Sequence, residues 1–151
     1  MALLRKKSRY QIDLNALERL CAANYIRVSR LFPTMQHQTH RSIQLVGGDV
    51  CLEVSHRGSY STQLLMSQTF KVLPIADPPS CAVIVYHDVR LAEVRRWDGV
   101  RIRQPRYQYP NSQMLQENEK WQINAFWGQW LDYCFACGVI EGTKLENCFD
   151  Y

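Results

Sequence analysis

The chain has 151 residues, 46% of them apolar and 11% aromatic, which is enough for one hydrophobic core and too little for two. Its 18 basic and 14 acidic residues leave a formal net charge of +4. The uncharged apolar runs have the length of strands, and no apolar run follows the charges of residues 1–9, so we expect neither a membrane span nor a signal peptide.

The first nine residues hold a charge equal to that of the whole chain. Their basic residues are Arg5, Lys6, Lys7 and Arg9. Because the rest of the chain is therefore balanced, we expect residues 1–9 to form a basic flexible arm. We expect residues 10–140 to form a single α+β domain and residues 141–151 a C-terminal tail.

The first predicted element is an amphipathic helix from residue 14 to residue 32. Asp13 is its expected N-cap, and Pro33 stops it. Its apolar stripe repeats every three or four residues and consists of Leu14, Leu17, Cys21, Tyr25, Val28 and Phe32.

From Ser42 the apolar period changes to two, which predicts strands. Gly47-Gly48 is the expected first hairpin turn, and Asp98-Gly99 a later one. The segment from Cys81 to Trp97 is too long for one strand and should break at His87-Asp88. The predicted strands are residues 42–46, 49–56, 60–69, the two halves of 81–97, and 100–104.

The last predicted element is a helix over residues 115–137, followed by Gly138 as a C-terminal cap. Its apolar face consists of Ile123, Phe126, Trp127, Trp130, Leu131 and Cys134. The expected fold is therefore α+β. An antiparallel sheet of about six strands, joined by hairpins, is flanked on one face by the N-terminal and C-terminal helices.

The stretch VYHDVRLAEV brings His87, Asp88 and Glu93 close together in the sequence. We favour a hairpin turn, because Asp suits turns and the flanking apolar residues suit strands. In this interpretation His87 is half exposed and Glu93 pairs with Arg101 or Arg103 of a neighbouring strand. Two alternatives stay open: a catalytic set in which His87 acts with Asp88 or Glu93, and a metal site, which would need further ligands.

The chain contains six cysteines, which we expect to be reduced thiols of a cytoplasmic protein and mostly small buried groups. Cys134 and Cys137 have CxxC spacing. They fall in the last turn of a predicted helix, where the helix dipole opposes a thiolate. A zinc site would need a second pair. We therefore predict neither a metal nor a cofactor.

A second basic segment, Arg90–Arg106, holds six arginines and ends beside two tyrosines. We expect Arg101 and Arg103 to share one strand face. Arg106, Tyr107 and Tyr109 extend this patch, which suits an anionic ligand or an acidic protein partner. A solvated outer face with ordinary ion pairs explains the same residues.

Four motifs taken together resemble the YqiB-like family of small bacterial proteins, a domain of unknown function. They are RLCxxN at residues 19–24, YHDxxxAEV at 86–94, RYxYPN at 106–111 and EKxQINxFxxxWLxYCxxxG at 119–138. The resemblance runs from about Tyr10 to Val139. It implies a cytoplasmic single-domain protein without established catalytic residues, cofactor or substrate. The genes that neighbour this family point towards nucleotide metabolism or signalling.

Our first hypothesis is a non-enzymatic cytoplasmic binding or adaptor domain that uses the arginine and tyrosine patch. The alternative is a small enzyme of nucleotide or phosphate metabolism that uses His87 with Asp88 or Glu93. A third and less favoured hypothesis is sequence-independent contact with nucleic acid, which would weaken steeply with salt.

Overall fold

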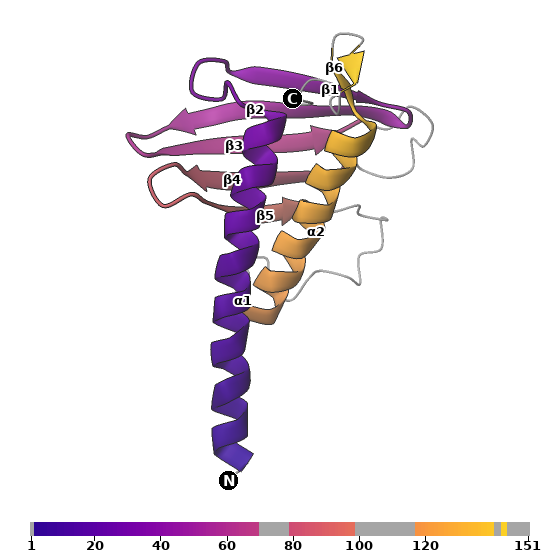
Figure 1. Cartoon of the computed structure of the whole chain (residues 1–151). Coiled ribbons are helices and arrows are strands. Elements are labelled where there is room, and N and C mark those ends of the chain that lie inside the picture. Colours follow the sequence, from indigo (N-terminus) through magenta and orange to yellow (C-terminus); the bar gives the residue numbers. More distant parts are fainter. Residues whose placement is uncertain (1, 70–78, 99–116, 141–142, 145–151) are drawn as a thin grey trace.

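The computed structural model describes residues 2–69, 79–98, 117–140 and 143–144, which form two helices and one antiparallel sheet (Figure 1). The elements are α1 (Ala2–Leu31), β1 (His40–Leu45), β2 (Gly48–Arg57), β3 (Ser61–Gln68), β4 (Ser80–Tyr86), β5 (Leu91–Asp98), α2 (Glu117–Cys137), β6 (Val139–Ile140) and β7 (Thr143–Lys144). The predicted α+β fold class is confirmed. The strand predicted at 100–104 lies outside the described residues.

The strands lie in the order β5-β4-β3-β2-β1-β6-β7, so β1 to β5 form a meander and α2 then returns the chain to the β1 side. Early in α2, Asn124 bonds Val94 of β5, and just after its end Val139 pairs with Gln44 of β1. A helix of 21 residues is about 30 Å long, and five strand spacings are about 24 Å. The length of α2 therefore matches the width of sheet that it crosses.

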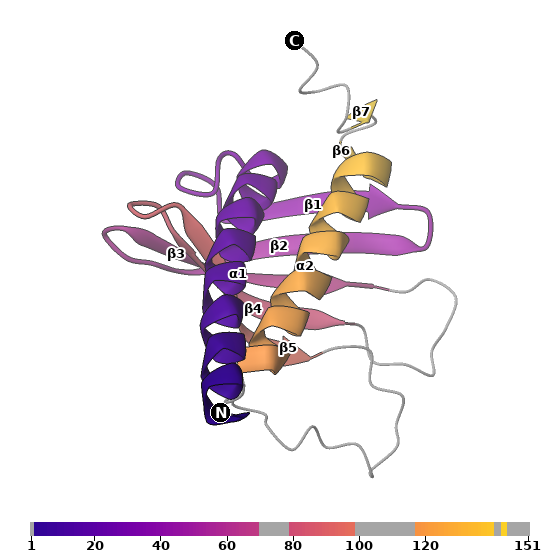
Figure 2. The same cartoon turned by 60° about the horizontal axis from the view of Figure 1, so that its bottom comes forward.

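Both helices lie on the same face of the sheet and run side by side in the same direction (Figures 1 and 2). α1 lies towards the turn between β4 and β5, where the rings of Tyr25 and His87 meet edge to face. α2 lies towards the opposite strand ends, where Trp130 Nε1 donates a hydrogen bond to Gln68 Oε1 at 3.1 Å.

The core lies between this helix pair and the covered face of the sheet. Alternation along the strands places apolar side chains on that face, as in β1, where Ile43 and Leu45 are buried and Ser42 and Gln44 are exposed. The largest fully buried side chains are Trp127, Phe32, Leu31, Ile43, Leu52, Leu64, Met66 and Leu131. The opposite face is polar over much of its area, as expected for an antiparallel sheet covered on one side.

The predicted start of the first helix is wrong. α1 begins at Ala2, so Asp13 lies inside it, and the residues expected to form an arm are helical. The apolar stripe from Leu14 marks the region that packs, whereas a helix can continue beyond its contacts because its backbone hydrogen bonds are internal. The N-terminal half of α1 extends past β5 (Figure 1). The division of the chain into arm, domain and tail stays a prediction.

The first hairpin is shifted by one residue from its predicted position. Leu45 pairs with Gly48, so the turn consists of Val46 and Gly47 rather than of the two glycines. Gly48, the first residue of β2, has a φ of 152°. A residue with a Cβ rarely adopts this conformation, so glycine is needed at the start of the strand.

Of the helices in the described part of the chain, none has the length and apolar character needed to cross a membrane.

Candidate functional site

The stretch VYHDVRLAEV forms two strand ends and the turn between them. β4 ends at Tyr86, β5 begins at Leu91, and residues 87–90 connect them, as predicted. The amide of His87 donates a hydrogen bond to the Tyr60 carbonyl oxygen at 2.8 Å. Arg90 closes the turn with a φ of 56°, in the left-handed region that few residues other than glycine adopt.

The imidazole of His87 is half-buried and connects this turn to two other elements. Its Nε2 lies 2.8 Å from the hydroxyl oxygen of Thr62 in β3, and its ring meets Tyr25 of α1 with centroids 6.2 Å apart. Burial lowers the pKa of His87, against a smaller opposite effect of Asp88. These contacts give His87 a role in holding the turn against β3 and α1.

Glu93 and Asp88, the two carboxylates of the catalytic alternative, lie in different surroundings from His87. Asp88 is exposed in the turn. The Glu93 carboxylate is 3.6 Å from Arg95 Nη1 and 3.9 Å from Lys120 Nζ. The described contacts of His87 and Glu93 therefore go to different partners, and the arginine beside Glu93 is two residues along the same strand.

The predicted binding residues Arg101, Arg103, Arg106, Tyr107 and Tyr109 lie outside the described residues. The predicted pairing of Glu93 with Arg101 or Arg103 therefore stays a prediction. The structure does describe both flanks of this segment, Trp97-Asp98 at the end of β5 and Glu117 at the start of α2.

The cysteines of the described part are free thiols. Burial raises the pKa of Cys134 to about 12, so this thiol stays protonated at neutral pH. Cys137, three residues on, is exposed, whereas Cys134 is fully buried. The two thiols of the CxxC sequence therefore lie in different environments, Cys134 in the core and Cys137 at the surface.

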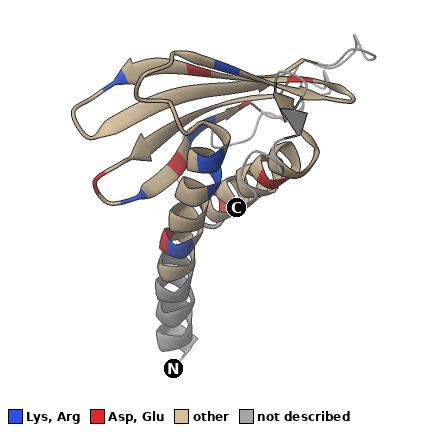
Figure 3. Cartoon of the chain, turned by 45° about the horizontal axis from the view of Figure 1, so that its top comes forward, with Lys and Arg blue, Asp and Glu red and all other residues tan. Residues whose placement is uncertain are grey.

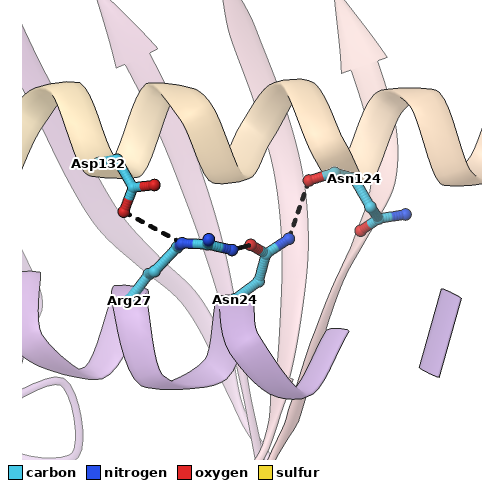
Figure 4. Close-up of polar contacts among 4 residues, drawn as sticks. All are labelled: Asn24, Arg27, Asn124 and Asp132. Atoms are coloured by element: carbon cyan, nitrogen blue, oxygen red, sulfur yellow. Dashed lines mark hydrogen bonds and ion pairs between the residues drawn. The ribbon is translucent and has the colours of Figure 1, made fainter. Parts of the chain in front are cut away.

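A polar network that is buried at Asn24 and Asn124 and exposed at Asp132 joins α1 to α2 (Figure 4). Asn24 is fully buried, and its Nδ2 donates to the carbonyl oxygen of Asn124 at 2.9 Å. Arg27 Nη1 donates to Asn24 Oδ1 at 2.8 Å, and Arg27 Nε donates to Asp132 Oδ1 at 3.1 Å. The chain of bonds fixes the position of one helix along the other, because it joins specific polar groups of α1 to specific polar groups of α2.

The side chain of Asn124 extends this network to the sheet. Its Oδ1 accepts the Val94 amide of β5 at 2.9 Å, and its Nδ2 donates to the Lys120 carbonyl oxygen at 2.8 Å. Both asparagines belong to the motifs that carry the family resemblance, but the sequence suggested no role for them. The signal that could have found them was an asparagine within each apolar helix face, since a buried amide needs partners.

Four aromatic side chains form a group that we call the aromatic ridge: Phe126, Trp130 and Tyr133 of α2 and Trp97 of β5. Trp97 and Trp130 are half-buried. Phe126 is 61% exposed and Tyr133 49% exposed. The Trp97 ring meets Phe126 at 5.6 Å and Trp130 at 6.1 Å, both edge to face. Phe126, Trp130 and Tyr133 share a helix face because they are four and seven residues apart.

Part of the face of α2 that was predicted to lie in the core is instead at the surface. Trp127, Leu131 and Cys134 are fully buried as expected, but Phe126 is exposed and Trp130 is only half-buried. The apolar face predicted for α2 therefore spans a wider part of the helix surface than the part that packs against the sheet. The central core position belongs to Trp127, whose Nε1 lies 3.3 Å from the sulfur of Met66.

A shallow hollow of about 370 Å³ lies where α1 passes the edge of the sheet, at the opposite strand ends from the ridge. We call it the α1–β5 hollow. Its walls include Leu17, Glu18 and Cys21 of α1 together with Tyr86, Leu91 and Glu93 of β4 and β5. Burial, followed by the charge of Glu93, raises the pKa of the Cys21 thiol to about 11.

Acidic and basic residues are interspersed over the helices and the sheet in the described part of the chain (Figure 3). Arg27 pairs with Asp132, and Arg96 with Asp98 at 3.4 Å. This mixture agrees with the sequence, in which the excess positive charge is concentrated in residues 5–9 and 90–106.

Comparison with known proteins identifies the family. The profile of the family described as "Protein of unknown function (DUF1249)" matches residues 27–140. The chain is 33% identical over 133 residues to "Uncharacterized protein YqiB" of Escherichia coli strain K12, which covers 87% of this chain and 95% of that relative. The YqiB proteins of Escherichia coli O6:H1 and O157:H7 match equally well. No solved structure matches the chain. Because the profile and the relatives cover most of its length, the chain belongs to the DUF1249 family of YqiB-like proteins.

Proposed function

We propose that this protein is a non-enzymatic cytoplasmic adaptor domain that binds an acidic protein partner through the aromatic ridge. The observation that carries the proposal is the exposure of Phe126 and Tyr133 beside the Trp97 and Trp130 rings. Exposed groups of large apolar side chains mark interaction sites, and Trp, Tyr and Arg dominate the binding energy of protein interfaces.

Basic residues close to the ridge support an acidic partner. Arg95 and Arg96 immediately precede Trp97 in β5, and their side chains are 61% and 63% exposed. In the sequence, residues 99–116 connect the end of β5 to the start of α2. This segment contains Arg101, Arg103, Arg106, Tyr107 and Tyr109. We include these five residues in the proposed binding surface.

The cytoplasm is the proposed location because its reducing conditions keep thiols free, and the cysteines of the described part are unpaired. In an oxidising compartment, the exposed Cys137 would be a target for disulfide formation.

Site-specific photo-crosslinking in bacterial cells tests the proposal. Benzoylphenylalanine is placed at position 126 in the ridge and, as a matched control, at position 46. Val46 is 98% exposed but lies in the turn between β1 and β2. We expect a discrete protein adduct from position 126 and none from position 46.

The dependence of the adduct on charge and on the ridge separates specific binding from random collision. Replacing Arg101, Arg103 and Arg106 together by Ala should lower the adduct yield, and so should Tyr133→Ala. Both sets of variants should keep the melting temperature. Equal adducts from positions 126 and 46, or a yield unchanged by all these substitutions, would show that the ridge is not the binding surface.

A further inference from the structure

The outer side of α2 extends the aromatic ridge in both directions along the helix. Three residues before Phe126 comes Ile123, which is half-buried against the core. Four residues after Tyr133 comes Cys137, which is exposed. We call this line of α2 residues the seam: Ile123, Phe126, Trp130, Tyr133 and Cys137.

The spacing of the seam is that of a helix–helix contact. Its successive members are three, four, three and four residues apart. Apolar residues at this alternating spacing stay on one side of a helix and pack against a second helix that lies along it. From Ile123 to Cys137 the seam is about 21 Å long. Trp127 and Cys134 lie on the adjacent side of α2 and are fully buried in the core. The seam is therefore a second packing line of the same helix.

The contacts of the ridge disfavour an extended partner. A strand binds mainly through main-chain hydrogen bonds to a sheet edge, but the main-chain groups of α2 bond within the helix. A proline-rich segment binds in slots between aromatic rings. Here the Trp97 ring stands edge to face against both Phe126 and Trp130. In addition, Trp130 Nε1 already donates a hydrogen bond to Gln68. A partner helix needs neither main-chain donors nor slots, only a line of apolar side chains.

The residues that border the seam fit an acidic helix. On one side Gln122 and Gln129 are exposed and uncharged, so they repel neither sign of charge. On the side of β5, the side chains of Arg95 and Arg96 are 61% and 63% exposed. Their ion pairs within β5 have distances of 3.6 Å and 3.4 Å. Exposed pairs of this kind contribute little free energy, so a carboxylate of a partner can compete for either arginine.

We propose that the acidic partner presents an amphipathic α-helix, which packs lengthwise along the seam of α2. Its apolar residues contact Phe126, Trp130 and Tyr133, and its acidic residues lie towards Arg95 and Arg96. Because this helix belongs to the proposed partner, the proposal rests on the adaptor function.

Photo-crosslinking of the full chain in bacterial cells, read at the level of single residues, tests the proposal. Benzoylphenylalanine is placed at position 126, 133 or 137 of the seam and, as a matched control, at position 121. Trp121 is an aromatic residue of the same helix and is 40% exposed, but it is not a member of the seam. We expect protein adducts from the three seam positions and none from position 121.

Mass spectrometry of the adducts identifies the partner residue that each position reaches. Positions 126 and 133 are seven residues apart, which is about 10 Å along α2. A partner helix that lies along α2 covers this distance in about seven residues, whereas an extended chain covers it in about three. We therefore expect the two cross-linked partner residues to be about seven positions apart. The residues reached from positions 133 and 137 should be about four apart in the same segment.

The outcomes separate this proposal from the adaptor function. Absence of a protein adduct at position 126 would overturn both. Partner residues about three positions apart, or scattered over several segments, would leave the adaptor function and refute the helix. Adducts between two copies of this chain would refute a separate acidic partner. Tyr133→Ala should lower the adduct yield at position 126 severalfold and Trp121→Ala should not, so equal yields in these two variants would also refute packing along the seam.

Discussion

Trp127 and Phe126 are adjacent in the sequence, yet one is fully buried and the other is 61% exposed. Trp127→Ala should lower the free energy of unfolding by about 3–5 kcal/mol, because it leaves a cavity in the core. Phe126→Ala should lower it by less than about 1 kcal/mol, since it removes mainly an exposed ring and its contact with Trp97. Urea denaturation of both variants measures the difference. Similar losses would contradict the assignment of the two faces of α2.

His87 makes the stability of the domain depend on pH. Burial lowers its pKa in the folded state, so the unfolded chain binds a proton more readily than the folded protein. The stabilising effect is complete above the ordinary histidine pKa of about 6.5 and is lost as the pH falls below it. Chemical denaturation between pH 7.5 and pH 5.5 should show this decline in the native protein.

His87→Gln removes the titrating group and should flatten that decline. The control is His40→Gln, which replaces an exposed histidine of β1 and leaves His87 in place, so the decline should persist. An identical pH profile in the native protein and the His87 variant would show that the contact with Thr62 does not depend on the charge of the imidazole.

At the scale of the elements, the two helices approach closely at Gly128. A Cβ at this position would lie 2.6 Å from Asn24 Oδ1 and 3.1 Å from Arg27 Nη1. Ala favours a helix over Gly by about 1 kcal/mol, but overpacking against a buried asparagine costs about 1–3 kcal/mol. Gly128→Ala should therefore be destabilising despite the gain in helix propensity.

Thermal denaturation with Gly47→Ala as the control measures this effect. A Cβ added at Gly47 would meet no other part of the protein within 4 Å, so this substitution should change the melting temperature little. A Gly128 variant as stable as the native protein would mean that α1 and α2 can separate without loss. In that case the polar network of Asn24, Arg27 and Asp132 would not fix their spacing.

For the whole molecule, α2 makes the sheet and the helices dependent on one another. It contacts β5 through Asn124 near its start and leads directly into β6, which pairs with β1. The domain should therefore unfold in a single cooperative transition. Far-UV circular dichroism reports all elements, and tryptophan fluorescence reports α2 and β5, which carry the four tryptophans. The two urea transitions should coincide, and separate midpoints would show that α2 detaches before the meander unfolds.

The local signals of the sequence identified most of the elements. The break at His87-Asp88 follows from strand length, and the end of α1 before Pro33 follows from the restricted backbone of proline. The break and the helix end can both be predicted because each depends on a short stretch of sequence. The start of α1 was missed because a helix that continues beyond its packed region has no apolar stripe to mark it. The predicted turn between β1 and β2 was displaced by one residue, since the sequence does not show which of two adjacent glycines adopts the positive φ.

The candidate sites depended far more on tertiary structure. The sequence alone determined the fold class and the family motifs. It also determined that the chain is rich in cysteine and has one hydrophobic core. These features depend on periodicity and composition, which are local properties of the sequence. Only the folded structure decided that His87 turns towards Thr62 and Tyr25, that Glu93 faces the α1–β5 hollow, and that Asn24 and Asn124 join the helices. It also decided that Phe126 is exposed while Trp127 is buried. The physical reason is that burial and hydrogen bonding are set by residues far apart in the chain, such as Asn24 and Asn124, which are 100 positions apart.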